Sequence, residues 1–401
     1  MRILKQDIDR RVIIKLDKSI QSTGDNVKGY MKFGVDNDYP QVIERIINNS
    51  VSGKVCRNIY ANFLCGYGFE NEEINKIVIG KDNKGKKITI LKLLRQVCTS
   101  FATFNGSYIH VNLNLEKKIV NTTHIPFKKC RFAKIDDNGY TSKIGVYENW
   151  DKDKNLEYNK SKIRWYHLFN LNQEVFAKQI NESKDIKKFK GQIYHHFLDN
   201  DFLYPLSPFD SVYLDCDTEY QVSVFKNNTT RNGMTKKTVL RMQEPGNDED
   251  LKDLEKEVKS FQGSDGKNLL VVFDEVDPTT GEIKKSGAFA LDTIESNIDD
   301  KIFEGWQKDL TNNIRKAIKN LPSVLIEIEE SKLGTTSGEA IIQAVNFYNA
   351  MTEDDRVSVS EMFQEIFSNF DDDLLLNNTN WKIKPLDLNG KFTNIGTTTI
   401  N

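Results

Sequence analysis

The strongest candidate for catalytic chemistry is the lysine-rich stretch VIGKDNKGKK. Gly80, Gly85 and Lys86 stand at the GxxxxGK spacing of a phosphate-binding loop, whose backbone amides and lysine hold phosphates. Lys87 occupies the position where such a loop carries a Mg²⁺-binding hydroxyl, and a lysine offers no such oxygen. Residues 82–85 read DNKG, which is typical of a turn. We therefore expect a hairpin tip, and keep a nucleotide-using nucleic-acid enzyme as the rival hypothesis.

The remaining residues that could do chemistry lack suitable companions. His195 and His196 have no cysteine or carboxylate at metal-ligand spacing, so in the strand-like YHHFL we expect one of them to face inward. Asp371–Asp373 could chelate a cation, but a solvated helix end is the simpler interpretation. The cysteines form no CxxC pair, which favours buried free thiols in a reducing compartment. They are Cys56, Cys65, Cys98, Cys130 and Cys216. The sequence thus predicts no catalytic residues, no cofactor and no metal site.

The bulk composition is that of a folded, rather polar chain with little net charge. Its 401 residues are 38% apolar, include 23 Phe and 14 Tyr, and carry a formal net charge of −2 at pH 7. That length favours two or three domains. That charge argues against broad electrostatic capture of nucleic acid, although not against a nucleic acid that passes without being held. The N-terminal MRILKQDIDRR has no apolar signal region, and no apolar run approaches a bilayer span, so we expect no membrane contact.

The first half of the chain combines two helix patterns with alternating strand patterns. Apolar residues recur at helical spacing from Asp36 to Phe69, with Gly66 and Gly68 as the stop, and again from Ile88 to Phe104. Asp136–Gly139 reads DDNG, a typical hairpin turn. Period-two alternation predicts strands in residues 107–115, 117–125, 142–150, 163–171 and 191–198.

After Pro205 and Pro208 the second half alternates long helices with a small α/β segment. Strands are predicted in TVLRM, KNLLVVFDEV and GAFALDT, and the loop PSVLIEIEESKLG precedes a helix with the capping-box spacing Thr336–Glu339 and a buried face that ends at Met351. A polar tail closes the chain. The other predicted helices are Phe209–Arg231, 248–262, Asn297–Asn320 and 357–370. These patterns place the chain in the α+β class.

The order of these elements resembles that of the portal proteins of tailed bacteriophages, which form a ring at one capsid vertex. The resemblance covers roughly Asp36 to Tyr348, and the order and spacing of four stretches carry it. They are DYPQVIERIINNSVSGKVCRNIYANFLCGYGF, YPLSPFDSVYLDCDTEYQVSVFKNNTTRNGM, FQGSDGKNLLVVFDEV and NIDDKIFEGWQKDLTNNIRKAIKNLPSVLIEIEESKLGTTSGEAIIQAVNFY.

The resemblance implies the α+β phage portal fold, in which two long stem helices bracket a small α/β clip. The short C-terminal part departs from many relatives, which leaves the crown and its contact with packaged DNA open. Carried onto this chain, the regions are a mixed α/β wing at 1–208, stem helices at 209–232 and 296–321, a clip at 233–295, a tunnel loop at 322–336, a long wing helix at 337–352 and a short crown at 353–401.

The resemblance also implies a structural, non-enzymatic function. The expected role is a ring of twelve subunits through which double-stranded DNA enters and leaves the capsid. Expected partners are further copies of the chain, the terminase large subunit, a head-tail adaptor protein and the major capsid protein. The expected location is the virion, after assembly in the host cytoplasm. The alternatives are another ring-forming head-tail or baseplate protein and the nucleotide-using enzyme.

The implied tunnel loop carries the acidic stretch IEIEESK. Glu327, Glu329 and Glu330, repeated around a ring, would repel phosphates, so that the channel would not hold passing DNA. Lys332 would make a weak contact with the DNA. An ordinary exposed charged loop is the alternative interpretation.

The implied stem–clip junction is the polar stretch FKNNTTRNGMTKK. Asn and Thr are poor helix formers because their side chains bond to nearby backbone groups. They would cap the helix end, and Gly233 would adopt a positive φ at the exit. The cations of this junction would contact either the adjacent subunit or passing phosphates. They are Arg231, Lys236 and Lys237.

A closed ring repeats one heterologous interface, so each subunit needs apolar surface on its long helices. The residues expected to supply that surface are Phe209, Tyr213, Tyr220, Trp306 and Leu310. Packing within a single chain is the alternative for each of them.

Overall fold

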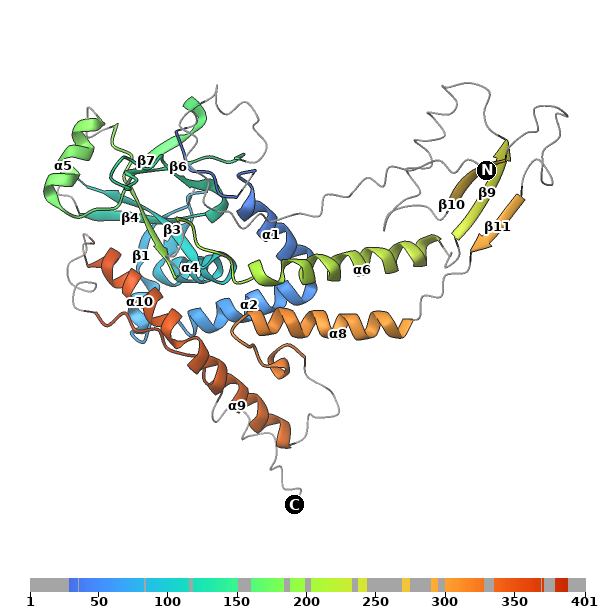
Figure 1. Cartoon of the computed structure of the whole chain (residues 1–401). Coiled ribbons are helices and arrows are strands. Elements are labelled where there is room, and N and C mark those ends of the chain that lie inside the picture. Colours follow the sequence, from blue (N-terminus) through green and yellow to red (C-terminus); the bar gives the residue numbers. More distant parts are fainter. Residues whose placement is uncertain are drawn as a thin grey trace, which may run out of the picture. The chain divides into compact units, whose positions relative to one another are not determined.

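The computed structural model describes residues 29–34, 36–82, 84–114, 118–150, 160–183, 188–198, 203–232, 237–243, 269–274, 290–294, 300–327, 335–368, 370 and 379–388. The chain divides into two compact units, whose elements are labelled in Figure 1. Unit 1 contains the described residues between 217 and 310. Unit 2 contains those between 29 and 216 and those between 311 and 388. Helices and strands occur in both units, which confirms the α+β class.

A six-stranded sheet organises unit 2. Its strand order is β4-β3-β8-β7-β6-β5, and neighbouring strands are antiparallel except for β7 and β8. The helix α5, Gln173–Glu182, joins β7 to β8, because a parallel pair needs a long connection. The strands are β3 Gly106–Leu113, β4 Ile119–Ile125, β5 Cys130–Phe132, β6 Lys143–Val146, β7 Arg164–Leu168 and β8 Gln192–Phe197.

The strands predicted in the first half of the chain are confirmed. Each of the five period-two segments contains one strand of this sheet. Asp136–Gly139 forms the predicted turn, with Gly139 at φ 86° and its N–H bonded to the Asp136 carbonyl at 3.0 Å. The polar helix α5 and the three-residue β5 were not predicted, because neither segment is long and apolar enough to show a period.

An aromatic core joins the start of the described chain to the sheet. The Phe33 ring stacks between those of Tyr39 and Tyr204, with ring centroids 4.7 and 4.3 Å away. The fully buried Tyr204 hydroxyl donates to the Met31 carbonyl at 2.9 Å and accepts the Phe132 N–H at 2.8 Å. Burial raises the pKa of Tyr204, so the phenol stays protonated and keeps its role as a donor.

A fully buried arginine lies beside this core. Arg131 Nε donates to Asn37 Oδ1 at 2.6 Å, and its terminal nitrogens donate to the carbonyls of Asn37 and Cys130 at 2.8 Å each. Its guanidinium carbon lies 5.7 Å from the Phe33 ring centroid and 5.5 Å from that of Trp150. Burial lowers the pKa of Arg131. Carbonyl oxygens and aromatic faces therefore replace the water that this cation loses.

The single helix predicted from Asp36 to Phe69 is wrong, because the structure contains two helices. α1 spans Tyr39–Asn49 and α2 spans Val51–Cys65. Ser50 between them has an extended backbone (φ −88°, ψ 128°), and its hydroxyl accepts the Gly53 N–H at 2.8 Å. A serine at this position starts a new helix by satisfying a free N–H group. The apolar spacing continues across the break, which is why spacing alone missed it.

The lysine-rich stretch is a β-hairpin, as predicted. β1 spans Val78–Lys81 and pairs with β2, Lys87–Thr89. The Asp82 carboxylate accepts the backbone N–H groups of Lys84 and Lys86, at 2.9 Å each. In a phosphate-binding loop these backbone amides would bind the phosphate. Here the amides of Lys84 and Lys86 are already bonded to the carboxylate of Asp82.

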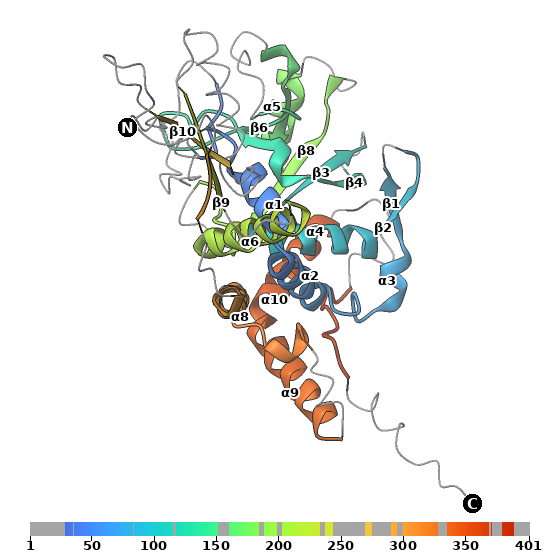
Figure 2. The ribbon, with the colours of Figure 1, turned by 90° about the vertical axis from the view of Figure 1, so that its right-hand side faces the viewer.

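Helix α4 packs between α2 and strand β3. It spans Ile90–Phe104, so the predicted start at Ile88 is two residues early, and Thr89 caps it by accepting the Lys92 N–H at 3.3 Å. The short α3, Glu72–Lys76, precedes the hairpin. Figure 2 shows α2 between the sheet and α9. The fully buried apolar residues of α4 are Ile90, Leu93, Leu94, Val97, Cys98, Phe101 and Ala102.

The C-terminal helices and part of the tail complete the core of unit 2. α9 spans Thr335–Met351 and α10 spans Glu353–Phe367, and the two lie end to end (Figures 1 and 2). The expectation of a purely polar tail is wrong for residues 379–388, because Trp381 and Ile383 are buried. The C-terminal part thus contributes to the same core as the sheet.

Two details of these helices differ from the prediction. Tyr348 is fully buried as expected, but Met351, predicted on the same buried face, is 42% exposed. α10 begins at Glu353, four residues before the predicted start, and only Thr352 separates it from α9. Apolar spacing does not predict this start, because the first turn, EDD, contains only acidic residues. Acidic residues nevertheless favour a helix N-terminus.

Unit 1 contains a three-stranded sheet and parts of two long helices. α6 spans Tyr213–Asn232 and α8 spans Asp300–Ala317. In the sheet, β9 pairs in parallel with β10 and antiparallel with β11. These strands confirm the three predicted in this region. They are β9 Lys237–Gln243, β10 Leu269–Asp274 and β11 Ala290–Ile294.

Two predicted helices of this region have different outcomes. The helix predicted from Phe209 begins at Tyr213, because a one-turn 3₁₀ helix, η4 Asp210–Val212, precedes α6. The charged helix predicted at 248–262 lies outside the described residues. Between α6 and α8, Lys226 Nζ donates to Gln307 Oε1 at 3.1 Å within unit 1.

The paired histidines of β8 lie on opposite faces of the sheet. The His195 ring centroid is 5.2 Å from those of Phe132 and Phe197. His196 Nε2 lies 2.7 Å from Ser358 Oγ on α10. His195 is the inward-facing residue that the sequence predicted, and His196 is also packed because α10 covers its face. Burial, and then the neighbouring His196, lowers the pKa of His195 to about 4.

We predict that the chain loses stability as the pH falls from about 6.5 to about 4. Burial lowers the pKa of both His195 and His124 to about 4, so the unfolded chain binds these protons first and acid favours unfolding. His195→Gln should therefore flatten the pH dependence of the unfolding free energy, measured by urea denaturation. The matched variant His167→Gln should keep most of the pH dependence of the unfolding free energy. Identical slopes for His195→Gln and the unmodified chain would contradict this.

Candidate functional site

Helix α8 ends in a cap built on two residues with positive φ. Lys319 and Asn320 have φ of 51° and 53°, a region that side chains other than Asn rarely adopt. The Leu321 N–H donates to the Arg315 carbonyl at 2.9 Å. The Asn320 N–H donates to the Lys316 carbonyl at 3.0 Å, so the cap satisfies two of the carbonyls that the end of the helix leaves open.

The sequence KNLP explains why α8 stops where it does. Asn320 tolerates the left-handed conformation, and Pro322 cannot continue a helix. Leu321 is fully buried, which anchors the cap in unit 2. The helix predicted to reach Asn320 therefore ends at Ala317, and the cap occupies the following residues.

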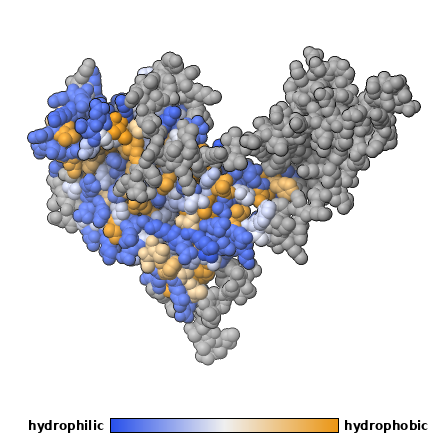
Figure 3. Space-filling view, viewed as in Figure 1, coloured by the Kyte–Doolittle hydropathy of each residue, from blue (hydrophilic) through white to orange (hydrophobic). Residues whose placement is uncertain are grey.

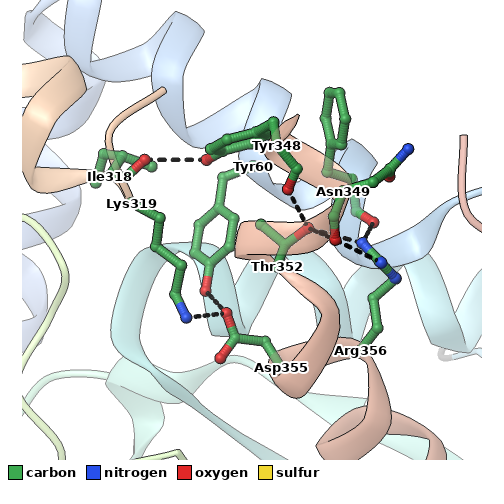
Figure 4. Close-up of polar contacts among 9 residues, drawn as sticks. Tyr60, Ile318, Lys319, Tyr348, Asn349, Thr352, Asp355 and Arg356 are labelled. Carbon is green, nitrogen blue, oxygen red and sulfur yellow. Dashed lines mark hydrogen bonds and ion pairs between the residues drawn. The ribbon is translucent and has the colours of Figure 1, made fainter. Parts of the chain in front are cut away.

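A buried polar cluster holds this cap to the surrounding helices (Figure 4). Lys319 Nζ lies 2.7 Å from Asp355 Oδ2, and the same oxygen accepts the Tyr60 hydroxyl at 2.6 Å. Asp355 is only 7% exposed, and a buried carboxylate is stable only with such partners. Burial, and then the charge of Asp355, raises the pKa of Tyr60 well above its usual value, so this hydroxyl remains a donor.

Tyr348 on α9 makes a second link to the end of α8. Its hydroxyl donates to the Ile318 carbonyl at 3.1 Å, and so satisfies one of the carbonyls that a helix end leaves open. Burial raises the pKa of Tyr348, which keeps the phenol protonated. Its ring also meets the Phe63 ring of α2 edge-on, at 4.8 Å between centroids.

Arg356 ties α9 to α10. Its guanidinium donates to Thr352 Oγ1 and to the Asn349 carbonyl, at 2.7 Å each, and Thr352 Oγ1 donates to the Tyr348 carbonyl at 2.8 Å. A cation at the C-terminal end of α9 is favoured by the open carbonyls and the helix dipole there. Burial lowers the pKa of Arg356.

We call this cluster the α8 joint. Its polar groups are used in hydrogen bonds to one another, so the arrangement positions segments and offers no nucleophile or general base to a substrate. It connects the end of α8 to α2, α9 and α10. Its residues are Tyr60, Lys319, Tyr348, Thr352, Asp355 and Arg356.

The α8 joint lies at the root of the acidic loop. After the cap comes a one-turn 3₁₀ helix, η5 Ser323–Leu325, and then the exposed Glu327, whose N–H donates to the Ser323 carbonyl at 2.9 Å. Glu329, Glu330 and Lys332 lie outside the described residues, so their orientation stays a prediction.

The three cations of the helix–strand junction are placed only by their backbone. Arg231 lies in the last turn of α6, and Lys237 is the first residue of β9. Lys236 and Gly233 lie outside the described residues. Which partner these cations meet stays a prediction.

The five residues expected to pack between subunits differ widely in exposure. Phe209 is fully buried in unit 2, so it presents no surface to a neighbour and the intrachain alternative holds for it. Tyr213 and Leu310 are half-buried. Tyr220 and Trp306, in unit 1, are 38% and 51% exposed. Exposure therefore leaves four of the five residues accessible to some degree.

The remaining candidates for chemistry in the described part of the chain are metal-binding clusters, hollows and thiols. Within it, no group of three or more His, Cys, Asp or Glu side chains could hold a metal ion. A hollow of about 520 Å³ beside the sheet has a lining in which Lys129 and Glu148 already pair at 2.5 Å, and His110 bonds to the Lys190 carbonyl at 2.7 Å.

All five cysteines are buried free thiols, as predicted. None of the described helices is long and apolar enough to cross a bilayer.

Comparison with known proteins identifies the fold. No protein-family model matches the chain, and no curated protein matches it. A chain in the virion of a native gene transfer agent particle is similar over 88% of this chain and 84% of its own, with a TM-score of 0.50 and 14% identity. This chain therefore shares the fold of a component of that particle.

Two further similarities are too weak to carry an argument. One is to a chain in the neck of an empty gene transfer agent particle, with a TM-score of 0.49, 14% identity and coverage of 88% and 85%. The other is to an HK97-family phage portal protein from Corynebacterium diphtheriae, with a TM-score of 0.35, 9% identity and coverage of 75% and 84%.

Sequence reasoning did not find the α8 joint. Its residues come from α2, α9, α10 and the end of α8, and no motif links positions as distant as Tyr60 and Asp355. The one usable signal was KNLP, whose Asn and Pro mark a capped helix end.

We predict that Asp355→Ala destabilises the chain by about 2–4 kcal/mol, because it leaves the Tyr60 hydroxyl buried without an acceptor. Lys319→Ala should cost about 1 kcal/mol, since its side chain is 36% exposed and water screens the pair. The control Lys382→Ala breaks an exposed pair with Glu70 and should change stability by less than about 0.5 kcal/mol. Denaturant unfolding measures all three, and equal effects would contradict this ranking.

Proposed function

We propose that this protein is a tailed-bacteriophage portal protein, a closed ring at one capsid vertex whose channel carries double-stranded DNA during packaging and ejection. The observation that carries the proposal is the element order: α6, a three-stranded sheet, α8, a loop and α9. This order occurs within a fold that the chain shares with a component of a gene transfer agent virion. Two long helices that bracket a small sheet are the stem and clip that the sequence resemblance implies.

The loop after α8 supports a channel that guides DNA without holding it. Its first acidic residue, Glu327, is exposed, and Glu329 and Glu330 follow in sequence. Many phosphate-neutralising cations would bind DNA tightly, whereas carboxylates repeated around a ring repel it. In this proposal the α8 joint holds the root of the loop still while DNA passes, and Lys332 makes a weak contact.

The proposed assembly contains twelve copies of the chain and is structural, not enzymatic. The terminase large subunit would supply ATP-driven translocation, a head-tail adaptor protein would dock after packaging, and the major capsid protein would surround the ring. Assembly would take place in the host cytoplasm, and the finished ring would lie at the portal vertex of the virion. Two amides of the GxxxxGK stretch are occupied by Asp82, which supports a role without nucleotide binding.

Mass measurement with negative-stain imaging of the purified chain tests this proposal. We expect closed rings with a through-channel and a mass near twelve times that of the 46.2 kDa chain. A stable monomer at the ionic strength of a cell would overturn the proposal. Rings without a channel would favour another head-tail or baseplate protein, and nucleotide binding that Lys86→Ala abolishes would favour the enzyme.

We predict that replacing Glu327, Glu329 and Glu330 together by Lys slows DNA packaging by about tenfold while rings still form. Three added cations per subunit would bind passing phosphates, so raising the salt concentration should partly restore the rate. The measurement is DNase-protected DNA in a reconstituted packaging reaction.

The control for this loop variant is Glu72→Lys with Glu73→Lys, which reverses two charges instead of three, on exposed residues of α3. It should package at the normal rate. If the loop variant also packages normally in intact rings, these carboxylates do not face the DNA.

A further inference from the structure

Helix α9 presents an exposed face without charge. From Ala340 to Thr352 the sequence AIIQAVNFYNAMT contains no acidic or basic residue. Tyr348 faces the core of unit 2, but Phe347 and Met351 are 46% and 42% exposed, and Ala350 beside them is exposed too. Apolar surface is visible over α9 in Figure 3. A surface helix normally carries charges on its outer side, and a helix without them is normally buried.

We propose that a second copy of the chain covers this face of α9, an inference that rests on the proposed ring. Leaving this face in contact with water is unfavourable, because Phe347 and Met351 would stay exposed one turn apart on the same face. DNA and an anionic membrane surface are also poor occupants, because the face offers no cation to meet phosphates. A protein surface with apolar residues is the occupant whose chemistry fits.

The chain itself carries further exposed apolar residues near the starts of α2 and α6, and we assign them as the other half of the contact. Val51 and Leu214 are 69% and 53% exposed, and the exposed Lys54 lies one helical turn from Val51 on α2. The uncharged face of α9 is bordered at its C-terminal end by the exposed acids Glu353 and Asp354. The two surfaces therefore pair apolar residues with apolar residues and an acidic border with a cation.

The two surfaces satisfy the rule for closing a ring. A cyclic ring is built from one heterologous contact, in which two different patches of the same chain meet again and again. Both patches belong to unit 2, so one compact body carries the two halves of the contact. Apolar burial would supply affinity, and the opposite charges would select the register.

The double variant Phe347→Ser and Met351→Ser tests the α9 half of this contact. Both side chains are exposed, so the variant should fold, which thermal unfolding followed by circular dichroism verifies. Losing two large apolar side chains should weaken each contact by about 100-fold and turn rings into monomers in mass photometry. The control Tyr140→Ser alters a side chain that is 74% exposed on a turn of unit 2, and should leave rings intact.

The outcomes separate this inference from the proposed function. Rings that persist in the Phe347→Ser, Met351→Ser variant overturn the inference and leave the proposed function standing. An unmodified chain that never forms rings overturns the proposed function itself.

A charge swap tests the α2 half. Lys54→Glu should lower the yield of rings by about tenfold, because it places a carboxylate opposite Glu353 and Asp354 of the neighbouring copy. Adding Asp354→Lys in the same chain should restore the yield, since each contact then pairs opposite charges again. A merely structural effect of Lys54→Glu would not be rescued in this way. Failure of the rescue would overturn the assignment of α2 as the surface opposite α9.

Discussion

The buried carboxylate of Asp355 is the constraint on which the position of the C-terminal end of helix α8 depends. At 7% exposure it needs hydrogen-bond donors that the chain must bring from elsewhere, and they come from α2 and from the end of α8. Tyr60 and Lys319 meet on one oxygen atom only if α2, α8 and α10 are packed in a single arrangement. A buried polar contact of this kind limits sliding, because any shift leaves a charge without its partner. The loop that follows α8 therefore starts from a defined point.

Helix α9 connects this constraint to the proposed assembly. Its Tyr348 hydroxyl donates to the Ile318 carbonyl just after α8, and the adjoining side of the helix carries Phe347 and Met351 at the surface. In the proposed ring, a force on the loop would reach α9 through the α8 joint. From α9 it would reach the neighbouring subunit through the proposed contact. Arg356 links α9 to α10, and Arg131 links Asn37 to the sheet; both cations are held by carbonyl oxygens.

Much of the fold could be predicted from the sequence, because long apolar periods and turn residues are local signals. The five strands of the first half, the three strands of unit 1 and the helices α4, α6, α8 and α9 were found in this way, with bounds a few residues off. The break at Ser50 was missed because the apolar period runs through it. The buried tail residue Trp381 was missed because nothing in its own neighbourhood predicts a contact with Phe69, to which its ring packs edge-on at 5.0 Å.

The candidate site was less predictable than the fold, because its contacts join distant segments. Glu327 was proposed through the sequence resemblance, and it is exposed in the structure, while its contact with DNA stays a prediction. Lys319 and Asp355 stood in ordinary charged stretches, and only the packing of their helices brings them to 2.7 Å. The absence of charge in α9 can be seen in the sequence. The sequence does not distinguish a buried helix from a helix at a subunit interface, because that distinction requires the exposure of its side chains.

Electron cryomicroscopy of the purified assembly tests the central claim most directly. The account predicts a closed ring with an open axial channel, in which the predicted tunnel loop at 322–336 lines the channel and the uncharged face of α9 lies against the next subunit. A ring whose channel is lined by other segments, with that loop on the outer surface, would contradict it. So would a chain that stays monomeric at every concentration examined.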